Sequence, residues 1–163
     1  MQFKNYPAER LIIPAIASRL ADDEWHLRQR ILSGIIAQGK PLLIDDFADD
    51  PADSQRLSAL VAKRAVVCDE AGAVTFAYPV SALPTQHRVT LTDGRTFRAM
   101  CAIDAMGAAF TFHQDVKVES WCTKCSEPVS VTICNGRLAA CSPPDLHVLH
   151  VDLNRNRNWS GSC

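Results

Sequence analysis

The sequence predicts an α+β protein: a three-helix, winged-helix-like N-terminal unit packed on a C-terminal antiparallel β-sheet region that holds one short helix. Apolar residues recur at helical spacing over the first 65 residues. Short apolar segments separated by turn residues follow from residue 66 onward. Because three helices followed by a hairpin is the order of a winged-helix unit, we expect that unit over residues 1–80 and the β-rich region over residues 81–163.

The three expected helices have recognisable ends. The first covers residues 11–21, where apolar residues fall at helical spacing. The second covers residues 25–38 and follows two aspartates, and Gly39 stands where a glycine in the left-handed conformation commonly closes a helix. Asp50 would cap the third helix, with Pro51 at its first position, because the missing N–H of proline has no partner there in any case.

Turn residues mark the strands. Residues 66–80 predict a hairpin that turns at residues 70–72. Residues 87–91 and 96–100 flank an Asp-Gly pair, which predicts a second hairpin. An Asn-Gly pair at 135 and 136 predicts a third, with a two-residue type I′ turn. The remaining strands are expected at residues 117–121, 128–133, 137–141 and 146–153.

Composition and charge exclude several classes of function. The formal net charge is -1 and the pI is about 6.5, which gives no electrostatic case for binding nucleic acid or anionic lipid. The acidic segment 44–53, before the third helix, would also repel phosphate. The apolar runs are shorter than a membrane span, and the N-terminus lacks the apolar stretch of a signal peptide. We therefore expect a cytoplasmic protein that binds neither nucleic acid nor membrane.

Seven cysteines are many for such a chain. Their odd number excludes pairing all of them as internal disulfides, and in a reducing compartment cysteines more often serve metal or thiol chemistry. Some could equally be small buried hydrophobic residues. Cys122 and Cys125 have the spacing of half a zinc site, and Cys134 and Cys141 could supply the other half.

The predicted hairpin argues against a four-cysteine zinc site. A two-residue turn at Asn135 and Gly136 would pair Cys141 with Ser130, leaving Cys134 on the same face but about 13 Å away at roughly 3.3 Å per residue. Zinc needs its sulfur ligands within about 4 Å of one another. A full tetrahedral site is therefore not expected, whereas a secondary metal site formed by the first two cysteines alone stays open.

Cys101 and Asp104 stand in an otherwise apolar run, RAMCAIDAMGAAF, over residues 98–110. If residues 101–110 form the short helix, the two side chains share one face. Cys101 would then lie in the first turn, where the helix dipole and unpaired N–H groups stabilise a thiolate. Asp104 is open to two interpretations: a carboxylate that caps the helix, or an acid–base group beside a reactive thiol.

The segment PTQHRVTLTDGRTFRAMCAIDAMG, residues 84–107, resembles the core motif of the organomercurial (alkylmercury) lyase family. In that motif a Pro-x-x-His-Arg strand and a D-G turn lead to C-A-[IL]-D. ESWCTKCSEPVSVTI resembles the family's single cysteine followed by a P-V-S strand. Cys163 lies 62 positions after Cys101, close to the spacing of the family's two catalytic cysteines. A winged-helix-like half before a β-rich half is also the family's layout.

The resemblance implies protonolysis of carbon–mercury bonds, which gives a hydrocarbon and Hg(II). Cys101 would be the thiolate that first attacks mercury, Asp104 the acid–base residue and Cys163 the second thiol, so the three would also hold mercury as substrate and product. Cys122 matches a cysteine with a structural role, and Cys125 has no counterpart. The implied partners are an organomercurial, cellular thiols and a mercuric reductase that accepts Hg(II); no organic cofactor is required.

Two alternatives stay open. A thiol-rich metal-binding or metal-sensing protein could use the same scaffold without turnover, and a related lyase could act on another substrate, such as a carbon–sulfur bond. Family members commonly continue for several dozen residues past the second cysteine, whereas this sequence stops on it. We therefore expect either a shortened C-terminus or a short relative of the family.

Overall fold

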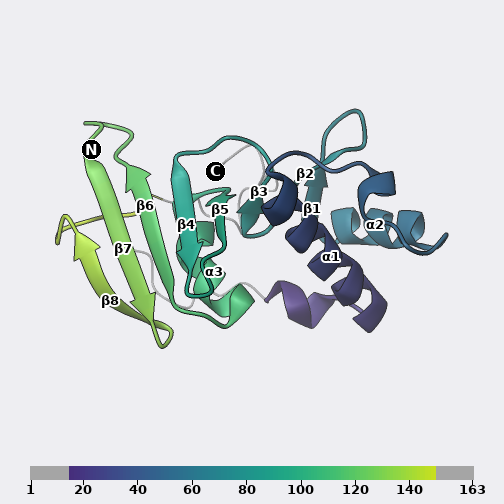
Figure 1. Ribbon diagram of the computed structural model, residues 1–163, viewed down its shortest axis with the longest axis horizontal. Helices are drawn as coiled ribbons and strands as arrows, with labels where there is room; N and C mark the ends of the chain where they lie inside the picture. The colour runs from purple at the N-terminus through teal and green to yellow at the C-terminus, as the bar shows by residue number, and fades with distance from the viewer. Residues whose placement is uncertain (1–14, 150–163) are drawn as a thin grey trace.

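The computed structural model describes residues 15–149, which form an α+β fold built on one eight-stranded antiparallel sheet (Figure 1). The strand order is β1-β2-β3-β5-β4-β6-β7-β8. The helices are α1 (Asp22–Gln38), α2 (Asp53–Ala62) and α3 (Ala102–Phe112). The strands are β1 (Val66–Cys68), β2 (Val74–Ala77), β3 (Val80–Ser81), β4 (His87–Leu91), β5 (Thr96–Ala99), β6 (Val116–Trp121), β7 (Pro128–Cys134) and β8 (Arg137–Ser142).

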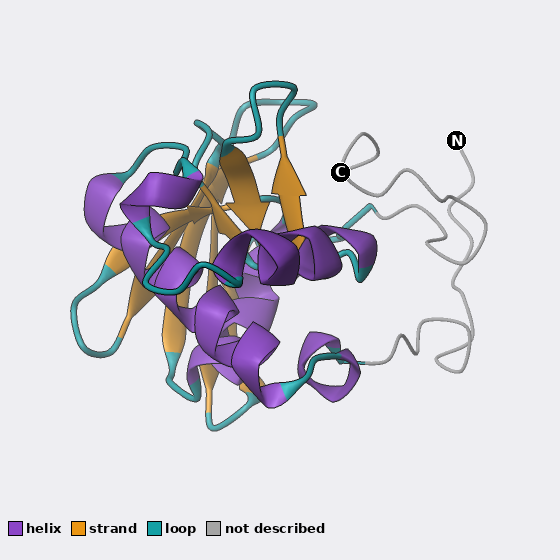
Figure 2. Ribbon diagram, turned by 90° about the vertical axis from the view of Figure 1, so that its right-hand side faces the viewer, coloured by secondary structure: helices purple, strands orange, loops and turns teal. Residues whose placement is uncertain are grey.

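The helices cover different parts of this sheet. α1 contacts β2 and β3, and α2 contacts β1, so these two helices lie over the end of the sheet that Figure 2 turns toward the viewer. α3 contacts β4, β5, β6 and β7 and lies behind β4 and β5 in Figure 1. Buried apolar residues from both groups form one continuous core. Within residues 15–149, no helix is long and apolar enough to cross a bilayer.

α1 confirms the second predicted helix. Leu27, Ile31 and Ile35 recur every fourth residue and are essentially inaccessible to solvent, which places one apolar stripe of the helix against the core. Gly39 has a φ of 65° and donates its N–H to the carbonyl of Ile35 at 2.8 Å, which is the left-handed helix end that the glycine predicts.

The first predicted helix is largely wrong where it can be compared. Within the described part of residues 11–21, only a short 3₁₀ turn forms, at Ile16–Arg19. Leu20 and Ala21 are extended, because α1 starts directly after them and the Glu24 carboxylate accepts the Ala21 N–H at 2.7 Å. The winged-helix arrangement stays a prediction, since residues 1–14 lie outside the described range.

The third predicted helix forms, but it begins two residues late. α2 starts at Asp53, and Pro51 lies in the turn before it. Asp50 caps that turn: its carboxylate accepts the N–H of Ala52 at 2.7 Å, and its carbonyl accepts the N–H of Asp53 at 2.9 Å. Asp50 therefore caps a turn that precedes the helix rather than the helix itself, and this extra turn shifts the helix start to Asp53.

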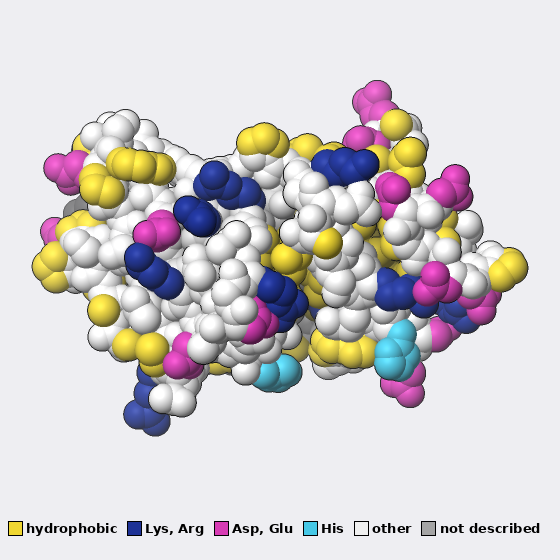
Figure 3. All heavy atoms as spheres, viewed as in Figure 1, with side chains coloured by type: hydrophobic (Ala, Val, Ile, Leu, Met, Phe, Trp, Pro, Cys, Tyr) yellow, Lys and Arg dark blue, Asp and Glu magenta, His cyan; other side chains and the backbone are white. Residues whose placement is uncertain are grey.

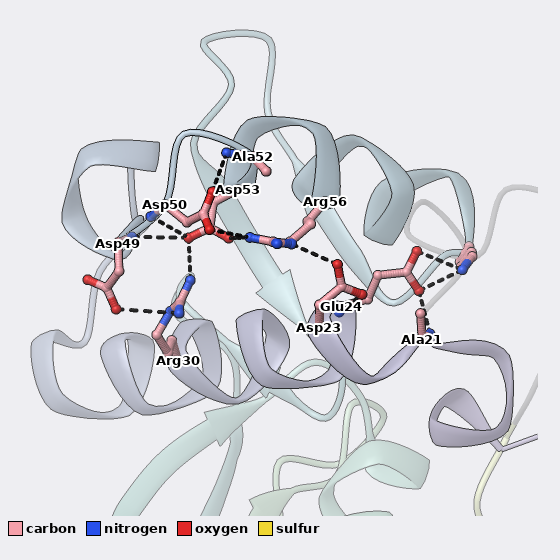
Figure 4. A network of polar contacts seen from close by, with 10 residues as sticks. Ala21, Asp23, Glu24, Arg30, Asp49, Asp50, Ala52, Asp53 and Arg56 are labelled. Atoms are coloured by element: carbon pink, nitrogen blue, oxygen red, sulfur yellow. Dashed lines mark hydrogen bonds and ion pairs between the residues drawn. The ribbon is translucent and has the colours of Figure 1, made fainter.

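A carboxylate withdrawn from solvent joins α1 to α2 (Figure 4). The Asp53 side chain is 2% exposed and forms ion pairs with Arg30 and Arg56. It also accepts the backbone N–H groups of Asp49 and Asp50. Burial alone would raise the pKa of Asp53, but the hydrogen bond from Arg56, those from the backbone and the charge of Arg30 lower the pKa below its ordinary value.

The predicted hairpin at residues 66–80 is present as β1 and β2, which turn at Asp69–Gly72. β3 then pairs with β5, so the sheet runs without interruption across residue 80, where we expected the two units to meet. That division of the chain stays a prediction. The β4–β5 hairpin is confirmed, with Gly94 in its turn at a φ of 87°.

The last hairpin corrects one predicted register. Cys134 opposes the first residue of β8 as expected, but Cys141 pairs with Val131 rather than Ser130, because a bulge leaves Ala139 without a partner. The one-residue shift places Cys141 against the core and Cys134 on the opposite face of the sheet. Of the predicted strand at 146–153, residues 146–149 are irregular and the rest lies outside the described range.

Candidate functional site

Cys101 occupies the junction between β5 and α3. It is extended, with φ −144° and ψ 176°, and serves as the N-cap residue of the helix. Two contacts fix the preceding residues: the Thr85 hydroxyl donates to the Ala99 carbonyl at 2.6 Å, and the Met100 N–H donates to the Pro79 carbonyl at 3.3 Å. The end of β5 is thus anchored on both sides, which gives the partly exposed thiol a defined position.

The structure brings Cys101 and Asp104 together as predicted. The Cys101 thiol donates to Asp104 Oδ2 at 3.1 Å, and the Asp104 N–H donates to the Cys101 sulfur at 3.5 Å. The sulfur therefore caps the helix, and the carboxylate of Asp104 is turned to the thiol instead of to a backbone N–H. This geometry favours the acid–base interpretation of Asp104 over the capping one.

The surroundings of Asp104 favour its protonated form. Burial raises the pKa of Asp104 to about 6, and the hydrogen bond from Cys101 offsets this only in part. No lysine or arginine in the described part of the chain forms an ion pair with Asp104. A carboxyl with this pKa exchanges its proton near neutral pH, as a general acid should.

His87 lies close to this junction and was not predicted as a site residue. It pairs with Ala99 on β5, and its Nδ1 lies 2.9 Å from Ser120 Oγ on β6. Burial lowers the pKa of His87, which favours the neutral ring. His87 is the histidine of the Pro-x-x-His-Arg motif, but the sequence predicts that motif only as a strand.

Cys122 and Cys125 lie together in the turn between β6 and β7. Two backbone hydrogen bonds close the turn. The Ser126 N–H donates to the Cys122 carbonyl and the Cys122 N–H donates to the Glu127 carbonyl, both at 2.8 Å. The backbone N–H groups of Cys125 and Lys124 lower the pKa of the Cys122 thiol. A backbone hydrogen bond at Glu127 lowers the pKa of Cys125, but the hydrogen bond with Cys122 and burial raise it overall.

The other residues predicted as metal ligands do not form a metal-binding group. Among residues 15–149, no three His, Cys, Asp or Glu side chains lie close enough together to hold a metal ion. Cys134 and Cys141 lie on opposite faces of the sheet, so these two cysteines do not complete a metal site with Cys122 and Cys125 within this range. Cys163 lies outside the described residues, so its place beside Cys101 stays a prediction.

A pocket of about 450 Å³ opens elsewhere, between the end of α1, the loop 81–84 and the strands β4 and β5. Arg88 and Arg98 line it from paired positions on these strands, over which basic side chains gather in Figure 3. Cys101 and Asp104 do not line this pocket. The candidate site is the junction of β5 and α3, where Cys101 and Asp104 meet, rather than this pocket.

Known proteins resemble this chain both in sequence family and in fold. The model of a family described as alkylmercury lyase matches residues 80–163. A solved structure described as the mercury-bound form of MerB2 has a similar fold, with a TM-score of 0.57 and 24% sequence identity. The similarity covers 79% of this chain and 64% of that one, so this chain spans less than two thirds of the other's length. No curated protein matched the sequence.

Proposed function

Because the chain belongs to the alkylmercury lyase family, we propose that it cleaves carbon–mercury bonds by protonolysis, releasing a hydrocarbon and leaving Hg(II) on thiolates. The observation that carries this proposal is the pair formed by Cys101 and Asp104, with sulfur and carboxylate oxygen 3.1 Å apart. The pair combines a soft ligand for mercury with a carboxyl whose pKa is raised to about 6.

The first step attaches the substrate to Cys101. As the sulfur attacks mercury, the thiol proton passes to the Asp104 carboxylate that already accepts it. A carbon–mercury–sulfur complex forms and the original counter-ligand leaves. The N–H of Asp104, which donates to the sulfur, stabilises the negative charge that develops there.

The second step breaks the carbon–mercury bond. Cys163, assigned by the resemblance to the family, whose second catalytic cysteine has a similar spacing, adds a second thiolate to mercury and pushes electron density onto carbon. Asp104 then gives its proton to that carbon, which leaves as the hydrocarbon. Two thiol protons enter the reaction: the Cys101 proton ends on carbon by way of Asp104, and the Cys163 proton passes to solvent, where it balances the charge of the counter-ligand released in the first step. Hg(II) remains bound by two sulfurs.

The proposed chemistry also predicts the cofactor requirement, the cellular location and the partners of the protein. The reaction needs no organic cofactor, because the protein supplies both the soft ligands and the proton. We place the protein in the cytoplasm, where thiols stay reduced. Cellular thiols would deliver the organomercurial, and a mercuric reductase would take the Hg(II).

A second candidate function is metal binding without turnover. The turn that holds Cys122 and Cys125 favours it, because two adjacent thiols bind soft metals without a proton donor. This function predicts that mercury binds while no hydrocarbon is released, so a single assay of product separates the two.

The test is release of benzene from a phenylmercury salt with excess thiol, measured by gas chromatography. We expect Cys101→Ser to abolish product and Asp104→Asn to slow it by about 100-fold or more, as for loss of a general acid. Cys134→Ser, a partly exposed cysteine next to a hairpin turn, is the matched control and should release benzene at the wild-type rate. Equal product from Cys101→Ser and wild type would refute the proposal.

A further inference from the structure

The two segments that carry cysteines for metal chemistry end at the same edge of the sheet. β5 and β6 both pair antiparallel to β4, so they run in the same direction, and both end at the top of the sheet in Figure 1. His87 on β4 pairs with Ala99 on one side and contacts Ser120 on the other. Cys101 lies two residues after Ala99, and Cys122 lies two residues after Ser120.

This register sets the separation of the two sites. One strand lies between β5 and β6, and neighbouring strands are about 4.8 Å apart, so the backbones at Ala99 and Ser120, on either side of His87, are roughly 10 Å apart. Each strand leads directly into its cysteine site, so the proposed reaction would leave its Hg(II) at the same edge of the sheet as a second pair of thiols.

The turn presents both of those thiols to solvent. Cys125 is exposed, Cys122 is partly exposed, and neither forms a disulfide. Backbone hydrogen bonds at both ends of the turn keep Cys122 and Cys125 on one loop, and the two thiols are close enough for each to shift the pKa of the other. Two sulfurs held in this way can bind one ion together, and a second contact within one chain strengthens binding greatly over a single thiol.

The number of ligands selects the metal. Within residues 15–149 no third His, Cys, Asp or Glu joins this pair as a metal-binding group. Structural zinc requires four ligands in a tetrahedron, whereas soft cations such as Hg(II) form stable complexes with two thiolates. The choice of Hg(II) over Cu(I) rests on the proposed function, because that reaction releases Hg(II) at this edge of the sheet.

We propose that Cys122 and Cys125 form a second mercury site, which binds one Hg(II) as a two-coordinate dithiolate independently of Cys101. One Hg(II) replaces two thiol protons, which pass to solvent, and no oxidant or reductant is involved.

The experiment uses mercuric chloride, excess glutathione as a competing monothiol, and native mass spectrometry. Cys101→Ala with Cys163→Ala is the background, which removes the first site. We expect this background to retain one Hg(II), and the further change Cys125→Ser to weaken retention by about 100-fold, because the chelate becomes a single thiol. Cys134→Ser in the same background is the matched control and should retain the ion.

Two results would overturn the site: a background protein that retains no Hg(II) under competition, or a Cys125→Ser protein that retains it fully. Cys125 is exposed, so its replacement should not unfold the chain, and thermal melting checks this directly. Because inorganic mercury is the probe, the outcome does not depend on carbon–mercury cleavage. Absence of benzene release would refute the lyase and leave this site intact, and loss of this site would leave the lyase intact.

Discussion

Two carboxylates near helix N-termini, Asp53 on α2 and Asp104 on α3, behave in opposite ways. Asp53 lies between Arg30 and Arg56, and these cations and the backbone N–H groups lower its pKa in spite of burial. Asp104 has a thiol as its hydrogen-bond partner, and burial raises its pKa to about 6. Burial penalises charge at both places, so the partner decides which protonation state results.

The difference separates a carboxylate that holds two helices together from the carboxylate that we propose as the proton donor. Asp53 keeps a fixed negative charge that holds α1 against α2, and a proton there would break the ion pairs. Asp104 binds a proton near neutral pH and stands beside a sulfur that can supply it. The same substitution, aspartate to asparagine, should therefore have opposite effects on stability at the two positions.

The largest effect is expected for Asp53→Asn. It leaves Arg30 and Arg56 without their shared carboxylate, and breaking one side of a buried ion pair lowers the free energy of unfolding by about 3 kcal/mol. Urea denaturation at pH 7 measures the change. Asp50→Asn is the control, because that side chain is 51% exposed and its pair with Arg56 should contribute less than about 1 kcal/mol. Equal effects at the two positions would contradict the structural role of Asp53.

Asp104→Asn should change stability in the opposite direction. The folded pKa of about 6 lies above the ordinary 3.8, so the wild type loses stability as pH rises from about 4 to 6 and stays lower above that. Asparagine removes this penalty and should raise the free energy of unfolding at pH 8 by about 1–2 kcal/mol, since partial exposure reduces the full value. Urea denaturation at pH 8 and at pH 4 tests it.

At pH 4 the gain from Asp104→Asn should disappear, because the folded wild-type carboxyl is then protonated. Asp53→Asn provides the control of opposite sign. The folded-state pKa of Asp53 is lowered, so the Asp53 carboxylate stabilises the fold at pH 7, and this stabilisation is lost as the pH falls through the folded-state pKa. A gain at Asp104 that is independent of pH would show that charge is not its cause.

The smallest effect is expected at the start of α1. Glu24 accepts the Ala21 N–H and pairs with Lys63 at 2.6 Å, while Lys63 is 37% exposed. Glu24→Gln keeps the cap and removes the ion pair, so the free energy of unfolding should fall by only about 0.5 kcal/mol. Added salt should shrink the difference between the two proteins; a large, salt-independent loss would place Glu24 with Asp53 as a buried structural charge.

Local signals predicted much of the fold. Gly39 closes α1, the Asp-Gly pair turns β4 into β5, and the spacing of Cys101 and Asp104 joins them on one helix end, because each depends on residues close in sequence. The bulge at Ala139 has no such signal, so the predicted partner of Cys141 was wrong by one residue.

Contacts between distant segments could not be predicted. The acidic segment before α2 was interpreted only as a surface that repels phosphate, yet its last residue, Asp53, pairs with Arg30, 23 positions away. Arg56 is likewise held by Asp53 and by Asp23, which lies 33 positions away in the sequence. The raised pKa of Asp104 also depends on burial by the folded chain, and burial cannot be inferred from the spacing of residues in the sequence.

The position of Trp121 has an optical consequence. This side chain is 56% exposed and directly precedes Cys122 at the edge where β6 ends. Trp25, by contrast, lies on α1 with its ring 5.4 Å from the guanidinium carbon of Arg28. A heavy atom bound at the turn would therefore quench the emission of Trp121 while leaving that of Trp25 unchanged, which makes the protein its own fluorescent indicator of mercury at this edge.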